Sequence, residues 1–211
     1  MENPQGESND GALRLDFDRR VKLEFHGSRI TSDAGLLAYR ELDEALGLST
    51  MAGEMLADTR TGKNGRHALV GLLRQSVFGR LAGYEDVNDA ERLRHDPAMR
   101  WIVGDKAALG CAASSSQMGR FETRWLTVAK NLSALSDLSG QWIDRVLAHR
   151  STRSIVLDMD SSVSPTHGEQ EKSVWNGHFE CTCYHPLFVF NQIGDLERSE
   201  LRPGNVHGAD G

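Results

Sequence analysis

The chain has few of the features that mark exported, membrane-spanning or disordered proteins. It has 3 cysteines in 211 residues, too few for a secreted disulfide framework, so we expect a reducing cytoplasm. Its longest apolar runs, such as residues 186–190, are far below the roughly 20 residues that span a bilayer. The polar, acidic start MENPQGESND lacks the layout of a signal peptide. With 39% hydrophobic residues, the chain is predicted to be globular with a sizeable core.

The charge is unevenly distributed along the chain. A net charge of −6 argues at first against a polyanionic partner. However, residues 1–59 carry 6 basic and 12 acidic side chains, residues 60–130 carry 12 and 7, and residues 131–211 carry 6 and 11. A basic middle between acidic ends is compatible with an ordinary solvated surface and also with a nucleic-acid-binding face.

Hydrophobic periodicity predicts a mainly helical region after a disordered tail over residues 1–12. Residues 13–17 and 21–25 alternate apolar and charged side chains, as a short hairpin would. Helical spacing follows, with Thr31 or Ser32 as a cap and Gly47 as the stop of the first helix. The further predicted helices cover residues 66–81, a segment from Asp86 or Asn88 to residue 93, a segment from Ser114 to Leu132 on one apolar stripe, and residues 139–149.

After residue 150 the pattern changes to strands. Residues 154–162, 181–191 and 195–202 are strand-like, with a turn predicted at 203–205. We therefore expect an α+β protein, with a mainly helical region over residues 13–150 and the start of a second domain over 151–211. The 57 residues from Ile155 to Gly211 contain no crossover helix after their strands, so the second domain is predicted to be incomplete.

Two carboxylates at the end of the first predicted strand are the strongest candidates in the sequence for a chemical role. Side chains alternate on a strand, so Asp158 and Asp160 share one face with Val156. Acids at the end of a buried strand lie where open α/β sheets bind ligands. Two acids repel unless a cation or a shared proton relieves them, and Mg²⁺ suits carboxylate oxygens. Solvation of a strand end, with a turn capped through Ser161 and Ser162, explains them equally well.

The segment DMDSSV also resembles the first motif of haloacid-dehalogenase-type phosphatases. In that hypothesis Asp158 would be the nucleophile and Asp160 the general acid. The downstream lysine of such enzymes is poorly matched, because Lys172 comes too early and no acidic pair follows on a later strand. A zinc site formed by His178, Cys181, Cys183 and His185 is disfavoured because three of these side chains would share one strand face.

Six blocks in order resemble the DDE transposases of bacterial insertion sequences, in the branch whose catalytic domain opens with a DxDxS/T strand. The blocks are GRLAGYEDVNDAERLRHDP (79–97), SSSQMGRFE (114–122), IVLDMDSSVSPTHGEQE (155–171), NGHF (176–179), YHPLFVF (184–190) and LRPGNVHGADG (201–211). The resemblance extends from about residue 13 to residue 211. Six ordered blocks are far more specific than any one of them.

The resemblance implies a ribonuclease H-like catalytic core on which three carboxylates hold two Mg²⁺ ions. The related pattern Asp-x-Ser/Thr falls on Asp160, which is therefore our choice for the first catalytic and metal-binding carboxylate, with Asp158 as the alternative. In the family the second Asp and the final Glu come after the LRPGN segment, and Asp195 and Glu197 lie too close to replace them. We therefore expect the catalytically incomplete amino-terminal part of a transposase. Mg²⁺ is expected as the cofactor of the complete protein, and its binding to this chain is expected to be weak or absent.

The resemblance further implies that the helical region helps recognise DNA at the terminal inverted repeats of the element. The expected assembly is a homo-oligomer or a mixed assembly with full-length transposase, cytoplasmic and nucleoid-associated in a bacterium, without a membrane partner. A non-enzymatic DNA-binding regulator or inhibitor of transposition is the alternative. Candidate phosphate-binding residues come from the basic middle: Arg74, Arg80, Arg92, Arg94, Arg120 and Arg124.

Overall fold

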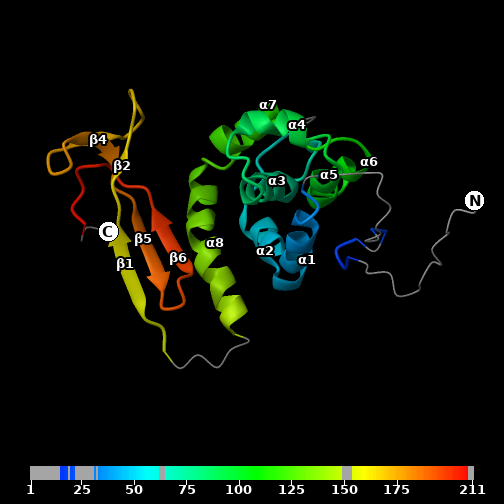
Figure 1. Ribbon diagram of the computed structural model, residues 1–211, viewed down its shortest axis with the longest axis horizontal. Helices are drawn as coiled ribbons and strands as arrows, with labels where there is room; N and C mark the ends of the chain where they lie inside the picture. The colour runs from blue at the N-terminus through cyan, green and yellow to red at the C-terminus, as the bar shows by residue number, and fades with distance from the viewer. Residues whose placement is uncertain are drawn as a thin grey trace, which may run out of the picture. The chain divides into compact units, whose positions relative to one another are not determined.

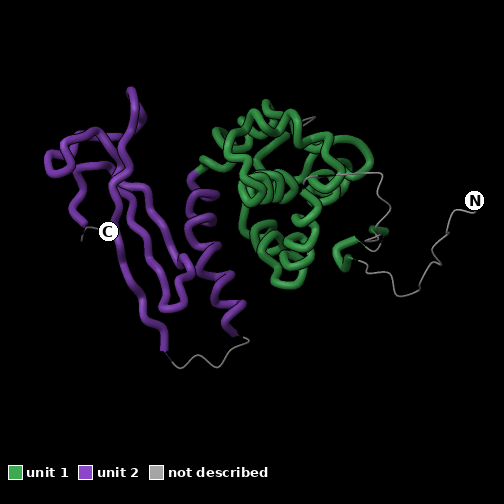
Figure 2. Tube along the Cα trace, in the orientation of Figure 1, with its two compact units in different colours: residues 1–128 green, residues 129–211 purple. Residues whose placement is uncertain are grey.

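The computed structural model describes residues 15–18, 20–21, 31, 33–61, 65–148 and 154–208. The chain forms two compact units, Met1–Val128 and Ala129–Gly211 (Figure 2). Helices precede small antiparallel sheets, which confirms the α+β class. The predicted tail over residues 1–12 lies outside the described residues, as does most of the predicted hairpin. The described part of the hairpin segment, residues 15–18 and 20–21, forms bends and a turn rather than a strand.

The first unit is built from short helices (Figure 1). In chain order they are α1 (Leu36–Leu46), α2 (Leu48–Met55), α3 (Leu69–Leu81), η2 (Val87–Asp89), α4 (Ala90–Leu93), α5 (Pro97–Val103), α6 (Lys106–Leu109), α7 (Ser115–Arg120) and η3 (Phe121–Trp125).

The first helix ends where the sequence predicts. Gly47 has φ 76°, and its N–H donates to the Asp43 carbonyl, because a left-handed residue at this position lets the chain satisfy a terminal carbonyl. The predicted start is wrong for Thr31. Its hydroxyl accepts the Asp33 N–H in a turn, and Gly35 is the N-cap without a side-chain hydrogen bond. Ser32 lies outside the described residues.

Helix α3 is central, as its apolar circumference predicts. It packs against α2 and α5, and it begins at Leu69, three residues after the predicted start. Gly71 lets the backbones approach, since a Cβ there would lie 3.3 Å from the Val103 carbonyl oxygen. The core next to this contact consists of the buried side chains Leu36, Phe78, Leu93, Met99, Ile102, Val103, Ala107 and Ala112.

The predicted single stripe from Ser114 to Leu132 is wrong. Ser114 and Gln117 form a capping box at the start of α7, but the helix then widens into a π-turn in which the Leu126 N–H donates to the Phe121 carbonyl. A π-turn changes the direction of the side chains that follow. Phe121 is consequently fully buried, whereas Leu132 is 52% exposed.

The second unit starts with α8 (Ala129–Leu147), which includes most of the segment predicted over residues 139–149. Two three-stranded antiparallel sheets follow, in the orders β1-β5-β6 and β2-β4-β3. Their strands are β1 (Leu157–Ser161), β2 (Ser164–Pro165), β3 (Val174–Asn176), β4 (Cys181–Tyr184), β5 (Leu187–Asn191) and β6 (Leu196–Glu200).

Helix α8 belongs to the second unit because it packs on β6. The Ser139 hydroxyl donates to the Leu196 carbonyl at 2.5 Å. Gly140 faces the same strand so closely that a Cβ would lie 3.1 Å from the Glu197 carbonyl oxygen, and Asp137 pairs with Arg198. The unit boundary after Val128 therefore precedes the change of sequence pattern at residue 150.

The expectation of a buried first strand is wrong. Strand β1 pairs with β5 on one side and is an edge of its sheet among the described strands. Val156 is 62% exposed and Met159 58% exposed. A short apolar run predicts a strand, but it does not reveal whether other elements of the fold cover the faces of that strand.

Replacing Gln75 with Ala should destabilise the first unit. Gln75 is buried, its amide nitrogen donates to the Ala113 carbonyl and its amide oxygen accepts the Ala113 N–H, both at 2.8 Å. The truncation leaves both backbone groups without this partner, so we expect a loss of about 3 kcal/mol in the free energy of unfolding. Urea denaturation measures it, with Gln141→Ala on the exposed side of α8 as the control. Equal stability of the two variants would contradict the prediction.

Candidate functional site

Asp158 and Asp160 share one face of β1, as the sequence predicts. In the antiparallel register Asp158 lies opposite Phe190, and Asp160 lies opposite Phe188. Directly opposite residues project to the same side of a sheet, so the acids stand beside an aromatic pair whose ring centroids are 6.2 Å apart. Both aspartates are exposed, and the strand rise separates their Cα atoms by about 7 Å. Their carboxylates are therefore open to solvent ions.

Polar contacts at both ends hold β1 in this register. Before the strand, the Gln192 side chain accepts the Val156 N–H at 2.9 Å and donates to the Ser154 carbonyl at 3.2 Å. After it, the Ser162 N–H donates to the Pro186 carbonyl at 3.1 Å. These contacts clamp the strand that carries the two acids.

Four of the blocks that carry the family resemblance converge in the second unit. The Arg202 side chain donates to the His185 carbonyl, and the His185 N–H donates to the Arg202 carbonyl at 2.9 Å. Asn176 donates through its side-chain amide to the Gly204 carbonyl. Farther along the same loop, a Cβ on Gly208 would lie 3.4 Å from the Ser161 hydroxyl. The loop after β6 thus returns to the end of β1, beside the acids.

The cysteines of the CTCYH segment are used for strand packing. Cys183 is fully buried, and burial raises the pKa of its thiol, with a contact to Cys181 adding to the effect. Across residues 15–18, 20–21, 31, 33–61, 65–148 and 154–208 there is no group of three or more His, Cys, Asp or Glu side chains placed to hold a metal ion.

Most of the arginines chosen from the sequence have partners inside the first unit. Arg74 is mostly buried, donates to the Ser49 hydroxyl and lies 3.7 Å from Asp43. Arg94 pairs with Glu91, and the guanidinium of Arg92 lies 5.0 Å from the ring centroid of Tyr84. Arg120 is half-buried and Arg124 is exposed. The six are therefore not a single exposed set.

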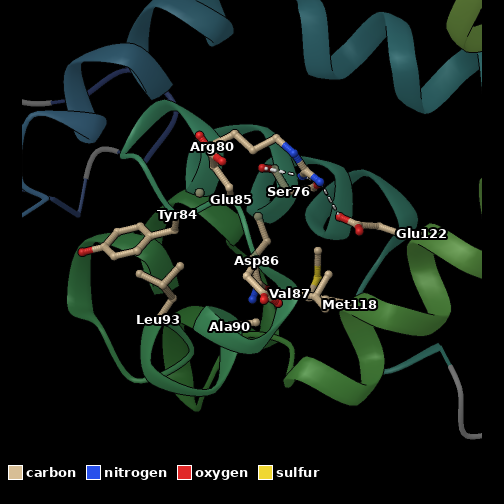
Figure 3. Close-up of a pocket in the computed structure, with 12 residues that line it drawn as sticks. Ser76, Arg80, Tyr84, Glu85, Asp86, Val87, Ala90, Leu93, Met118 and Glu122 are labelled. Carbon is tan, nitrogen blue, oxygen red and sulfur yellow. Dashed lines mark hydrogen bonds and ion pairs between the residues drawn. The ribbon is translucent and has the colours of Figure 1, made fainter. Parts of the chain in front are cut away.

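Arg80 joins two of the family blocks around a small pocket. It donates to the carboxylate of Glu122 at 3.0 Å and also contacts the Ser76 hydroxyl (Figure 3). The loop from Tyr84 to Ala90 forms another wall, with Asp86 accepting the Asn88 N–H at the start of η2. The pocket has about 20 Å³ for water-sized occupants, about enough for one water molecule. Its residues connect parts of the fold rather than hold a ligand.

Two exposed cations of the basic middle are not among the phosphate-binding candidates that the sequence suggests. Arg66 and Lys106 line a hollow of about 540 Å³ together with Arg20. Their exposure distinguishes them from the buried arginines. The exposure of a side chain depends on tertiary packing, so it could not be predicted from the local sequence.

The first unit is thus helical, and strand β1 of the second unit presents two carboxylates on one face. The family model described as transposase DDE domain group 1 matches residues 13–211, and the chain belongs to this family. The resemblance seen in the sequence is thereby confirmed. No curated protein and no solved structure matches the chain significantly. Within the described residues, no helix is long and apolar enough to cross a membrane.

Replacing Gly204 with Ala should destabilise the second unit. A Cβ there would lie 2.5 Å from the Cys183 carbonyl oxygen and 2.6 Å from that of Val174, and backbone atoms cannot move aside as a flexible side chain can. Overpacking of this kind should lower the free energy of unfolding by about 3 kcal/mol. Thermal denaturation tests this against Gly177→Ala, whose Cβ meets nothing within 4 Å. Unchanged stability in Gly204→Ala would contradict the packing described for this loop.

Proposed function

We propose that the chain acts in DNA transposition and that Asp160 is the first carboxylate of its metal-binding catalytic set, with Asp158 as the alternative. The observation that carries this proposal is the family match over residues 13–211, which includes the strand on which both acids share one exposed face. The choice of Asp160 rests on the Asp-x-Ser pattern of Asp160, Ser161 and Ser162. The proposed core is ribonuclease H-like.

The two aspartates suit Mg²⁺ as the expected ion. Carboxylate oxygens are hard ligands, and an exposed strand leaves room for the waters that Mg²⁺ retains. When bound in a pair, such ions stabilise the attacking and departing oxygens of a displacement at phosphorus. The role of Asp160 would be to anchor an ion through its carboxylate. The role of Asp158, two residues earlier on the same face, would be to add negative charge that favours the ion.

A complete catalytic centre would need acids beyond these two. The described residues place no third carboxylate with Asp158 and Asp160, and one strand cannot surround two cations. We therefore propose that DNA cleavage requires carboxylates in addition to those of β1, supplied in the complete transposase. A homo-oligomer or a mixed assembly with full-length transposase is compatible with this requirement.

The proposed DNA target is the terminal inverted repeat of the element. Membership in a transposase family implies DNA as the partner. The excess of 12 basic over 7 acidic residues between residues 60 and 130 favours this segment, nearly all of which lies in the first unit, as the source of the binding surface. The phosphatase alternative gains no support from the fold, since Lys172 lies exposed in a turn with φ 66° rather than on a strand beside β1.

Asp160→Asn should weaken binding of a divalent ion. Mn²⁺ is a suitable probe because it also prefers carboxylate ligands and its unbound form is counted by electron paramagnetic resonance. Loss of one of two carboxylates should raise the dissociation constant at least about tenfold, with a smaller increase for Asp158→Asn. Asp144→Asn on the exposed side of α8 is the matched control. If Asp160→Asn binds Mn²⁺ as tightly as this control, Asp160 is not a metal ligand.

The purified 211-residue chain should not nick DNA that carries the terminal inverted repeats. The reason is the need for additional carboxylates, so addition of Mg²⁺ should leave a supercoiled plasmid substrate intact. Gel electrophoresis of the plasmid after incubation measures the outcome. Efficient Mg²⁺-dependent nicking that disappears in Asp160→Asn would show that the chain carries a complete centre and would refute the requirement.

A further inference from the structure

The first unit has an open, cation-lined hollow that the family match does not explain. It occupies about 540 Å³, within the range of sites that bind ligands. Three positive side chains reach it from segments far apart in the sequence: Arg20 near the start, Arg66 ahead of α3, and Lys106 in α6. Among the described residues of the lining, Asp105 supplies the one acidic side chain. The hollow therefore has a positive surplus.

The charges of Arg66 and Lys106 are available to a ligand. Both side chains are exposed, and within the described residues neither is in an ion pair with a carboxylate. Arg20 differs, because it is paired with Asp18 and its guanidinium lies 5.4 Å from the ring centroid of Trp101. The charge of Arg20 is therefore partly offset by Asp18.

Two titratable groups lie near these cations. His67 is buried, and its pKa is lowered first by burial and then by the charges of nearby cations that include Arg66 and Lys106. The thiol of Cys111 accepts a hydrogen bond from Arg94 at 3.2 Å, and Arg66 approaches the same sulfur at 3.7 Å. These contacts, with Arg94 as the main cause, lower the pKa of Cys111. Cationic side chains of this region therefore also lie beside His67 and Cys111.

The hollow also has an exposed apolar rim. Leu109, at the end of α6, is 84% exposed. Helix α6 is held in place by Arg100, which donates to the Ala107 and Ala108 carbonyls. Cations next to an apolar side chain match a DNA strand, in which charged phosphates alternate with deoxyribose, because Lys and Arg bind phosphates.

We propose that this hollow binds the DNA backbone, with Arg66 and Lys106 contacting phosphates and Leu109 packing on the sugar between them. The proposal rests on the proposed role of the chain in transposition and assigns the DNA contact to a defined surface. Arg20 is a positioning residue that shapes the wall. The contact is with the backbone, so it orients DNA without reading its sequence.

Fluorescence anisotropy with a labelled random-sequence duplex tests the assignment. Each phosphate contact that is lost reduces the slope of log affinity against log salt by about 0.9, so Arg66→Ala/Lys106→Ala should reduce it by about 2. Affinity for the duplex should fall about tenfold or more at low salt. The matched control is Lys130→Ala/Arg145→Ala, which removes two exposed cations from α8 and should leave the slope unchanged.

The outcomes separate this inference from the function on which it rests. Absence of salt-dependent binding by the unmodified chain would overturn both. Binding whose slope is unchanged in Arg66→Ala/Lys106→Ala, or reduced equally in the control, would overturn only the assignment of this surface. Both substitutions of the test variant are at exposed positions, and circular dichroism verifies that its fold is retained.

Alkylation of Cys111 gives an independent measurement on the unmodified chain. Cys111 is half-buried beside Arg66, so bound DNA should slow its reaction with a bulky maleimide several-fold, measured by peptide mass spectrometry. Cys181 is also half-buried but belongs to the second unit, and its rate should not change. Equal rates at Cys111 with and without saturating duplex would overturn the placement of DNA at the hollow.

Discussion

The antiparallel pairing of β1 with β5 determines where the chemical groups of the second unit lie. Its register sets Asp158 and Asp160 opposite Phe190 and Phe188 and thereby places both acids on one face. A shift by one residue would move every side chain to the opposite face. The contacts of Gln192 before the strand, and of Ser162 after it, oppose such a shift. The metal-binding hypothesis depends on this pairing more than on any side-chain contact of the acids.

In the first unit, by contrast, charge has two separate uses. Buried or paired arginines such as Arg74 and Arg80 connect helices and loops. A buried cation is tolerated in the fold only because a partner compensates its charge. Exposed cations such as Arg66 and Lys106 add little to the fold and remain available to external anions. The basic middle of the sequence is therefore a sum of structural charges and surface charges, and only the surface charges can contribute to binding.

Features that depend on neighbouring residues in the chain could be predicted from the sequence. Gly47 ends α1, Asp86 caps η2, and Asp158 and Asp160 share a strand face, because each follows from local backbone geometry. The burial of β1 was predicted wrongly, because covering a strand depends on distant elements. The membership of α8 in the second unit rests on contacts such as Ser139 with Leu196. No pattern within the helix itself reports that partner.

Among the described strands, one edge of β1 has no partner, and this has a consequence for what can lie beside the two acids. Edge strands offer backbone groups for pairing with another strand, and a strand added to β1 would set its own side chains about 5 Å from those of Asp158 and Asp160. Extension of the sheet at this edge would therefore also change the surroundings of the two acids. Because a pairing strand is held by backbone hydrogen bonds, its register as well as its sequence would decide which of its side chains meet the carboxylates.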